Sequence, residues 1–433
     1  MILIFVSLIF IIIFAYTSSN HDVMAPGVLF TFSFLFSSGW ALMYAKNWSL
    51  NPSVGTILVI IMGTLEFVII SYGINKLVKN DLEKNKGLVW LNVNVVKTLI
   101  IIIIEAFIIL YVIRSIKGIT GVSELSDAIY TYRRVNLFSA KSFLLPKSVF
   151  IGNYFCNSVG FFYGYLLVKK LIKYKKLDFF MLVAIILSAY ESTLFGSRTG
   201  LFVLGLAMVT YFYCLKRISE GKNLKIKSKY YVIGITVISV FLGTFKQLAV
   251  LLGRDVYVSS FDYLAAYIGA EIKNLDSFIR ANNFPITTDI FHSQTVDYIS
   301  KFLGRLFGKG GLDYKLDLPF QSINGFDLGN VYTMFYQFIY DLGYVGVFLF
   351  TLLMAIIVQT IYSRVKLYKD NGKVSYSILL YGYIANTLVL AFFSNKFYEQ
   401  VANSSFVFVV FFWWILNLFV FTNPIKLRNK NGE

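Results

Sequence analysis

The sequence predicts an all-α polytopic membrane protein with about eleven transmembrane helices and two enlarged outer loops. Of its 433 residues, 57% are hydrophobic and 18% are aromatic, which is more apolar material than a water-soluble domain uses. The apolar residues form separate runs of membrane-spanning length. The charged residues gather in the short links between these runs, so the net charge of +17 indicates membrane orientation rather than a nucleic-acid partner.

The apolar runs are the predicted spans, because a spanning helix needs about 20 mostly apolar residues. They lie at residues 1–16, 27–44, 54–74, 95–113, 149–168, 178–195, 200–215, 230–248, 342–362, 375–393 and 405–421. The first run has no charged side chain and lacks the basic start and cleavage site of a signal peptide, so we interpret it as a span. Residues 1–433 then form a single integral membrane domain within the lipid bilayer.

Lysine and arginine concentrate on one side of this arrangement. The basic links are 75–94, 169–177, 216–229 and 363–374, together with the C-terminal tail. The opposite short links carry only Lys46, Arg198 and Lys396. The positive-inside rule therefore predicts that the basic links and the C-terminus face the cytoplasm. Link 17–26 is assigned to the cytoplasm without a basic residue of its own.

Two longer links are predicted on the outer face, at residues 114–148 and 249–341. In the larger one, apolar residues recur at helical spacing over 257–280 and 296–307. This pattern predicts amphipathic helices that lie on the helix bundle or at the outer interface.

Arg198 is the leading candidate for function. It lies in the turn Gly196-Ser197-Arg198-Thr199-Gly200, between two apolar runs and on the predicted outer face. The next helix begins at this turn, and a helix N-terminus beside a guanidinium group is suited to bind phosphate. The alternative is an arginine that extends to the lipid headgroups.

The large outer loop adds further cations on the same predicted face. Arg254, Arg280 and Arg305 are candidates to bind a pyrophosphate group, whose charge several arginines would neutralise. The alternative for Arg280 and Arg305 is the solvated face of an amphipathic helix. His292 is a candidate general base, or else a structural or solvated histidine.

Carboxylates and a late aromatic segment complete the candidate set. Glu191 precedes Arg198 by seven residues, about two helical turns, and either pairs with the arginine, receives a proton or packs between helices. Near the end of the large loop, Asn330 and Tyr332 are candidates to bind substrate. The tyrosine either belongs to an aromatic belt at the membrane interface or stacks on a sugar ring. Asp341, where a span begins, either caps that span or belongs to the same site.

No motif in the sequence indicates a metal or cofactor. It contains no P-loop, no dinucleotide-binding glycine motif and no HExxH. Its two cysteines, Cys156 and Cys214, both fall in apolar runs. We therefore predict chemistry that uses neither a metal nor a cofactor.

These features together resemble the O-antigen polymerase (Wzy) family of oligosaccharide repeat-unit polymerases. The resemblance is carried by the turn at 196–200, by the aromatic run from Tyr263 to Asp276, and by Gly329-Asn330-Val331-Tyr332-Thr333 followed by Asp341-Leu342-Gly343-Tyr344-Val345-Gly346. The two enlarged outer loops on a many-helix bundle also match the family layout.

The resemblance implies a metal-independent, GT-C-like membrane glycosyltransferase of the bacterial inner membrane. Its donor would be an undecaprenyl-pyrophosphate-linked oligosaccharide in the outer leaflet, with the active site facing the periplasm. Arg198 and Arg254 would hold the pyrophosphate, and His292 or Glu191 would serve as acid or base. A chain-length-regulating co-polymerase is a further implied partner.

Three other activities fit parts of this pattern. An O-antigen ligase would use the same donor with a different acceptor. A flippase of lipid-linked sugars would favour short loops, internal repeats and cations inside spans, whereas here the charged material lies in one long loop. A membrane acyltransferase would place its histidine in or beside a span, but His21 and His292 both fall in links.

Overall fold

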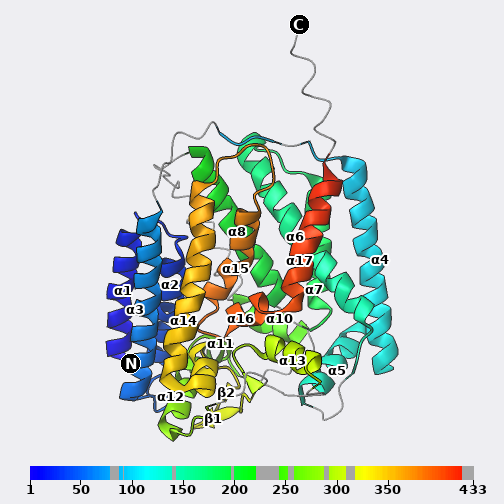
Figure 1. The fold of residues 1–433 in the computed structure, drawn as a ribbon. Helices are drawn as coiled ribbons and strands as arrows, with labels where there is room; N and C mark the ends of the chain where they lie inside the picture. The colour runs from blue at the N-terminus through cyan, green and yellow to red at the C-terminus, as the bar shows by residue number, and fades with distance from the viewer. Residues whose placement is uncertain are drawn as a thin grey trace. The chain divides into compact units, whose positions relative to one another are not determined.

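The fold is almost entirely α-helical. The computed structural model describes residues 1–78, 87–90, 92–138, 143–196, 199–220, 243–251, 258–286, 292–308 and 317–421. Within these ranges five helices are long and apolar enough to cross a membrane: Pro26–Met43 (α2), Val54–Leu77 (α3), Val95–Thr120 (α4), Thr199–Glu220 (α8) and Phe335–Leu367 (α14). The chain is therefore an all-α membrane protein (Figure 1).

Helices also occupy five other segments that the sequence predicted as apolar runs. They are Ile2–Ser18 (α1), Lys147–Tyr174 (α6), Phe179–Thr193 (α7), Tyr376–Val389 (α15) and Ser404–Val420 (α17). The remaining predicted run, 230–248, lies mostly outside the described residues.

Helix α14 begins before the predicted span because it contains a kink. Gly343 has φ 61° and ψ −151°, a conformation that is open to glycine and strained for other residues. The kink separates a short lead, 335–341, from the long apolar part of the helix. At Gly346, an added Cβ would clash with the Phe338 carbonyl. The two glycines therefore allow the lead to fold closely against the span.

The chain divides into two compact units. The first unit comprises Met1–Asp81, Tyr257–Leu367 and Ile384–Ser404. In it, α1, α2, α3 and α14 lie side by side (Figure 1). Their core is aromatic: the Phe30 ring stacks on Phe67 with centroids 4.2 Å apart, and Phe34 stacks on Phe335 at 5.0 Å. Gly63 of α3 makes room for Phe335, because a Cβ there would lie 2.7 Å from that ring.

In the described ranges, the large loop of the first unit contains three short helices and a hairpin. The helices are Ser260–Ile268 (α11), Ala270–Ala281 (α12) and Asp297–Leu306 (α13), and a further short helix, Lys396–Val401 (α16), follows α15. Strands Gln321–Ile323 (β1) and Phe326–Gly329 (β2) pair antiparallel. Asn324 and Gly325 join them with φ of 50° and 78°, as a tight two-residue hairpin requires.

The second unit comprises Leu82–Val256, Tyr368–Tyr383 and Ser405–Glu433. It contains α4, Leu125–Phe138 (α5), α6, α7, α8, Phe245–Leu251 (α10) and α17. Helix α6 is its centre, since it contacts α4, α7 and α8. An added Cβ at Gly160 of α6 would clash with Ser188 of α7. The Ser188 side chain therefore packs directly against the backbone of α6.

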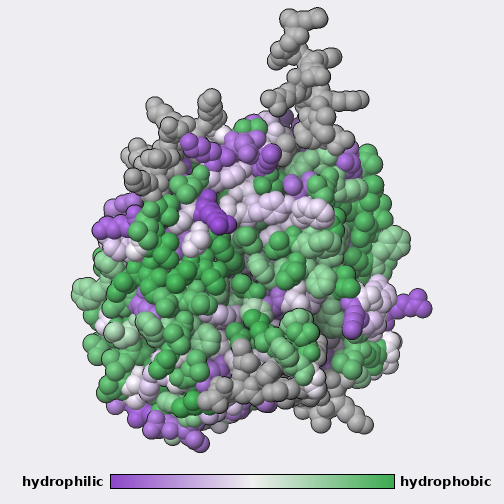
Figure 2. Space-filling view, viewed as in Figure 1, coloured by the Kyte–Doolittle hydropathy of each residue, from purple (hydrophilic) through white to green (hydrophobic). Residues whose placement is uncertain are grey.

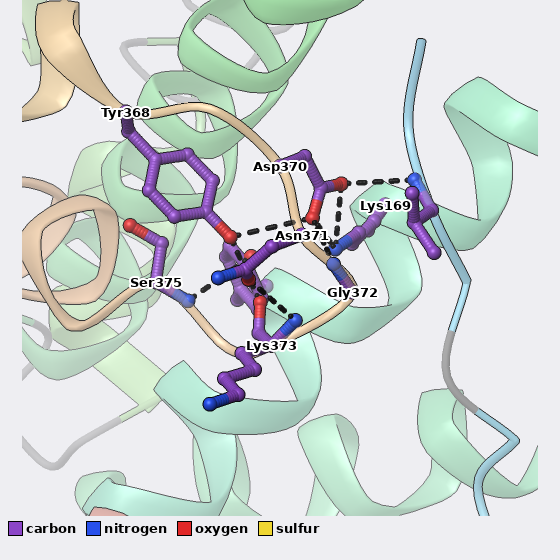
Figure 3. Close-up of polar contacts among 9 residues, drawn as sticks. Lys169, Tyr368, Asp370, Asn371, Gly372, Lys373 and Ser375 are labelled. Carbon is purple, nitrogen blue, oxygen red and sulfur yellow. Dashed lines mark hydrogen bonds and ion pairs between the residues drawn. The ribbon is translucent and has the colours of Figure 1, made fainter. Parts of the chain in front are cut away.

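A buried ion pair fastens one loop of the second unit to α6 (Figure 3). The Lys169 ammonium lies 2.8 Å from the Asp370 carboxylate, and these side chains are 3% and 0% exposed. Asp370 also accepts from the backbone N–H groups of Val89 and Gly372, both at 3.0 Å. One carboxylate thus joins three separate parts of the chain.

Apolar side chains also cover the outside of the helices. Phe10 of α1, Met62 of α3 and Phe348 of α14 are all exposed. Figure 2 shows hydrophobic side chains over the middle of these helices and hydrophilic ones towards their ends. In an aqueous protein such a surface would be a liability, whereas lipid hydrocarbon accommodates it.

We expect Asp370→Ala to destabilise the protein by about 3–5 kcal/mol, because it leaves the Lys169 cation buried and unpaired. Chemical unfolding in detergent micelles would measure the change. The matched control is Lys170→Ala, which breaks the more exposed pair with Asp178 (26% and 16% exposed) and should cost less than about 1 kcal/mol. Equal losses in the two variants would contradict the role given to Asp370.

Candidate functional site

The turn at 196–200 joins α7 to α8 in the second unit, and the local geometry favours glycine at both Gly196 and Gly200. Gly196 has φ 70°, and its N–H group donates to the Thr193 carbonyl at 2.8 Å. At Gly200 a Cβ would lie 2.5 Å from the Ser192 hydroxyl, so only glycine lets α8 start this close to α7. Ser197 and Arg198 themselves lie outside the described residues.

Glu191 lies in the last turn of α7, below this turn, and is fully buried. The Asn153 amide of α6 donates to both of its carboxylate oxygens, at 3.1 and 3.2 Å. Asn153 in turn accepts from the Asn157 amide at 2.9 Å. In the described part of the chain, the Glu191 carboxylate is therefore bound by the Asn153 amide and not by a cation. A buried carboxylate without a cation is costly, which makes Glu191 a functional candidate.

A second buried carboxyl group accompanies Glu191. Glu105 of α4 is fully buried, and within the described residues neither of its carboxylate oxygens has a hydrogen-bond partner. Its helix, α4, packs directly on α7, which carries Glu191. Sequence position alone does not connect the two groups, because they lie in different predicted spans.

Arg133 contacts the turn at 196–200, although the sequence analysis did not identify it as a candidate. Its guanidinium group donates to the carbonyl of Gly196. Helix α5 positions it by burying Ala128, Ile129 and Tyr132 in a cluster that includes Leu194. The only signal in the sequence was the pair Arg133-Arg134 in a loop predicted to face outward.

In the first unit, Asp341 binds the loop that follows His292, and we call this set of contacts the Asp341 clamp. It is buried, and it accepts from the Ser293 hydroxyl at 2.6 Å and from the N–H groups of Gln294 and Thr295 at 2.8 Å each. Its bonds therefore go to a distant loop, which differs from the capping of its own helix that the sequence suggested. His292 is half-buried and directly precedes this clamp.

Arg280 belongs to a second clamp, centred on Asp276 of α12. Asp276 accepts from the Ser53 N–H group at 2.7 Å, from the Thr56 hydroxyl at 2.8 Å and from the Arg280 guanidinium at 2.8 Å. Arg280 also donates to the Asn51 carbonyl. These contacts hold α12 against the start of α3, which gives Arg280 a structural task.

Tyr332 and Asn330 follow the hairpin. The Tyr332 hydroxyl donates to the Pro319 carbonyl at 2.9 Å and accepts from the Gln321 amide at 3.1 Å. The residue is only 3% exposed, so its ring does not offer a free face for a sugar to stack on. Asn330 is half-buried beside it.

Two predicted arginines cannot be placed in either group. Arg254 lies outside the described residues, and Arg305 lies in α13 with its side chain outside them. The first unit therefore contains His292, Arg280, Asn330, Tyr332 and Asp341, and the second contains Glu191 with the turn and Arg133. In the described ranges, no three histidine, cysteine or acidic side chains gather as a metal would require.

Comparisons of the chain with protein-family models, with curated proteins and with solved structures return no match.

Asp276 predicts a dependence of stability on pH. Burial by itself would raise its pKa, but the hydrogen bonds from Ser53, Arg280 and Thr56 outweigh burial and hold the pKa below its usual value. A lowered folded-state pKa stabilises the fold above the unfolded pKa of about 3.9, and this stabilisation is lost as pH falls through the folded pKa.

We therefore expect Asp276→Asn to lower thermal stability at neutral pH and to reduce the further loss on acidification below about pH 4. Thermal unfolding from pH 7 downward would measure both. Asp327→Asn, which changes an exposed carboxylate of β2, is the control and should follow the wild-type curve. Parallel acid curves for wild type and Asp276→Asn would contradict the prediction.

Proposed function

We propose that this protein is a glycosyltransferase that joins undecaprenyl-pyrophosphate-linked oligosaccharide repeat units into a surface polysaccharide. The product would be O-antigen, capsule or exopolysaccharide, made at the outer face of the bacterial inner membrane. In this proposal the protein has about eleven membrane spans and a GT-C-like architecture. It starts from the resemblance carried by the turn, the aromatic run and the late glycine segments.

The single observation that supports it most is the contact of Arg133 with the turn that carries Arg198. This contact adds a second guanidinium group to a short, glycine-rich turn, two residues from Arg198. Guanidinium groups bind phosphate oxygens through two parallel hydrogen bonds and remain charged at all physiological pH values. Two of them at one turn suit a pyrophosphate group better than an isolated arginine that contacts lipid.

The reaction places two demands on such a site. A hydroxyl of one repeat unit attacks the anomeric carbon of the donor, the bond to pyrophosphate breaks, and the hydroxyl proton passes to a base. Cationic groups stabilise the charge that develops on the leaving pyrophosphate. Glu191 is buried, lies five residues before Gly196 in the sequence and accepts from the Asn153 amide. It is suited to receive the proton, and His292 is the alternative base.

We expect Arg198→Ala to abolish chain extension, leaving single repeat units, and Arg198→Lys to be poor because lysine cannot form two parallel bonds. Arg133→Ala should slow extension about tenfold or more, the effect of losing one charge-assisted hydrogen bond. Purified protein in proteoliposomes with lipid-linked repeat units would be assayed for laddered products. The control is Arg134→Ala, an exposed neighbour that should retain wild-type extension.

Wild-type ladders from a stably inserted Arg198→Ala protein would contradict the assignment of this turn. Transfer of the lipid-linked sugar across the membrane without linkage would instead identify a flippase, and transfer to a lipid A core without laddering would identify a ligase.

Glu191→Gln separates a catalytic role from a packing role. Glutamine preserves the size of the side chain and a hydrogen bond with Asn153, but it cannot accept a proton. If Glu191 is the base, extension should fall by about 100-fold or more while thermal stability changes little. Glu66→Gln, a carboxyl group of α3 in the first unit, is the control. Undiminished extension by Glu191→Gln would leave Glu191 as a packing group.

A further inference from the structure

We propose that the first unit contains a phosphate-binding site at the end of α14 opposite the Asp341 clamp. The site is a cavity between the end of α1, the N-terminus of α2, the end of α3 and the last turns of α14. It is small, about 20 Å³, and is partly open to the outside. The lining residues that carry the proposal are Gly27, Ser71, Tyr72, Asn75 and Lys366.

Lys366 supplies a buried cation to this cavity. Its side chain is 3% exposed, and its ammonium group donates to the Asn75 side-chain oxygen at 2.9 Å. The nearest acid, Asp22, is 3.7 Å from the ammonium group, accepts from the Tyr362 hydroxyl at 2.5 Å and is not part of the lining. Lys366 is therefore paired with Asp22, and of the two groups only the lysine lines the cavity.

The N-terminus of α2 supplies a second attraction for an anion. This helix of 18 residues has no side-chain N-cap. Its first backbone hydrogen bonds come from Val28 and Leu29, both to the Ala25 carbonyl. Within the described residues the N–H group of Gly27, which precedes them, has no acceptor. Unbonded N–H groups and the helix dipole together favour a bound anion at such an end.

Ser71 is an independent sign that a ligand belongs here. It is 6% exposed and lines the cavity, and its hydroxyl has no hydrogen-bond partner among the described residues. Buried polar groups are almost always hydrogen-bonded, so an unpartnered hydroxyl on a residue that lines a cavity calls for a polar ligand. Tyr72 adds a second hydroxyl-bearing side chain to the lining.

The combined chemistry is that of a phosphate site. An ammonium group, a helix N-terminus and hydroxyl donors converge from three helices, and a tetrahedral anion accepts from several directions at once. From Gly343 to Lys366 the helix rises by about 35 Å, enough to cross the roughly 30 Å hydrocarbon layer. The site is therefore at the other end of this helix from Asp341, and the basic residues Lys76 and Arg364 are close in sequence to its lining residues Asn75 and Lys366. A phospholipid headgroup and free phosphate are the two sources of the ligand.

Two variants and a matched control test this site. Ser71→Val fills the cavity and removes its free hydroxyl without disturbing the ion pair of Lys366. Lys366→Gln removes the charge. Arg364→Gln removes an exposed cation from the same turn of the same helix and serves as the control. Purified protein in neutral detergent would be titrated with phosphatidylglycerol in one arm and inorganic phosphate in the other, with thermal unfolding and native mass spectrometry as readouts.

We expect phosphatidylglycerol, phosphate or both to raise the unfolding temperature of wild type and of Arg364→Gln equally. Ser71→Val and Lys366→Gln should bind at least about tenfold more weakly, the loss expected for one charge-assisted contact. A response to the lipid alone identifies a headgroup site, and a response to both identifies a general phosphate site. No response of wild type to either ligand, or equal binding by wild type and Ser71→Val, would overturn the proposal.

Discussion

Buried aspartates that accept hydrogen bonds from loop N–H groups are the interaction on which this structure depends. In so apolar a chain, an irregular segment has few partners for its backbone groups, and each unsatisfied group is costly. Asp341, Asp276 and Asp370 solve this problem at three places. Asp276 and Asp370 bind segments 223 and 281 residues away in the sequence, and Asp341 binds a loop 46 to 48 residues before it. The helices supply the scaffold, and these three carboxylates position the loops on it.

Much of the helical framework was predictable, because apolar runs of about 20 residues have few other structural solutions. The helix ends were less so. The predicted span at 342–362 starts seven residues after α14 does, since α14 also includes a mostly buried lead, 335–341, before the kink at Gly343. The hairpin at Asn324-Gly325 was not predicted either, although that dipeptide is a strong turn signal. Its strands are too short to show alternation.

The candidate residues were predictable where their neighbours in the sequence determine their position. They were not predictable where the position depends on a contact with a residue far away in the sequence. The two glycines of the turn at 196–200 and the buried Glu191 follow from local sequence. Arg133 does not, because its contact with Gly196 spans 63 residues and depends on how α5 packs. For the same reason Tyr332, expected as a sugar platform, is instead enclosed by the segment before the hairpin. Arg280, expected at an anion, is held by Asp276.

Function in this account depends on sidedness. The turn at 196–200 and the hairpin region must both face the outside, and the basic end of α14 must face the cytoplasm. Substituted-cysteine labelling with a membrane-impermeant maleimide tests this directly, since Cys156 and Cys214 are both buried. The account predicts that Thr199→Cys and Asp327→Cys react in intact spheroplasts, and that Arg364→Cys reacts only after permeabilisation. Labelling of Thr199→Cys and Asp327→Cys from opposite sides would contradict it.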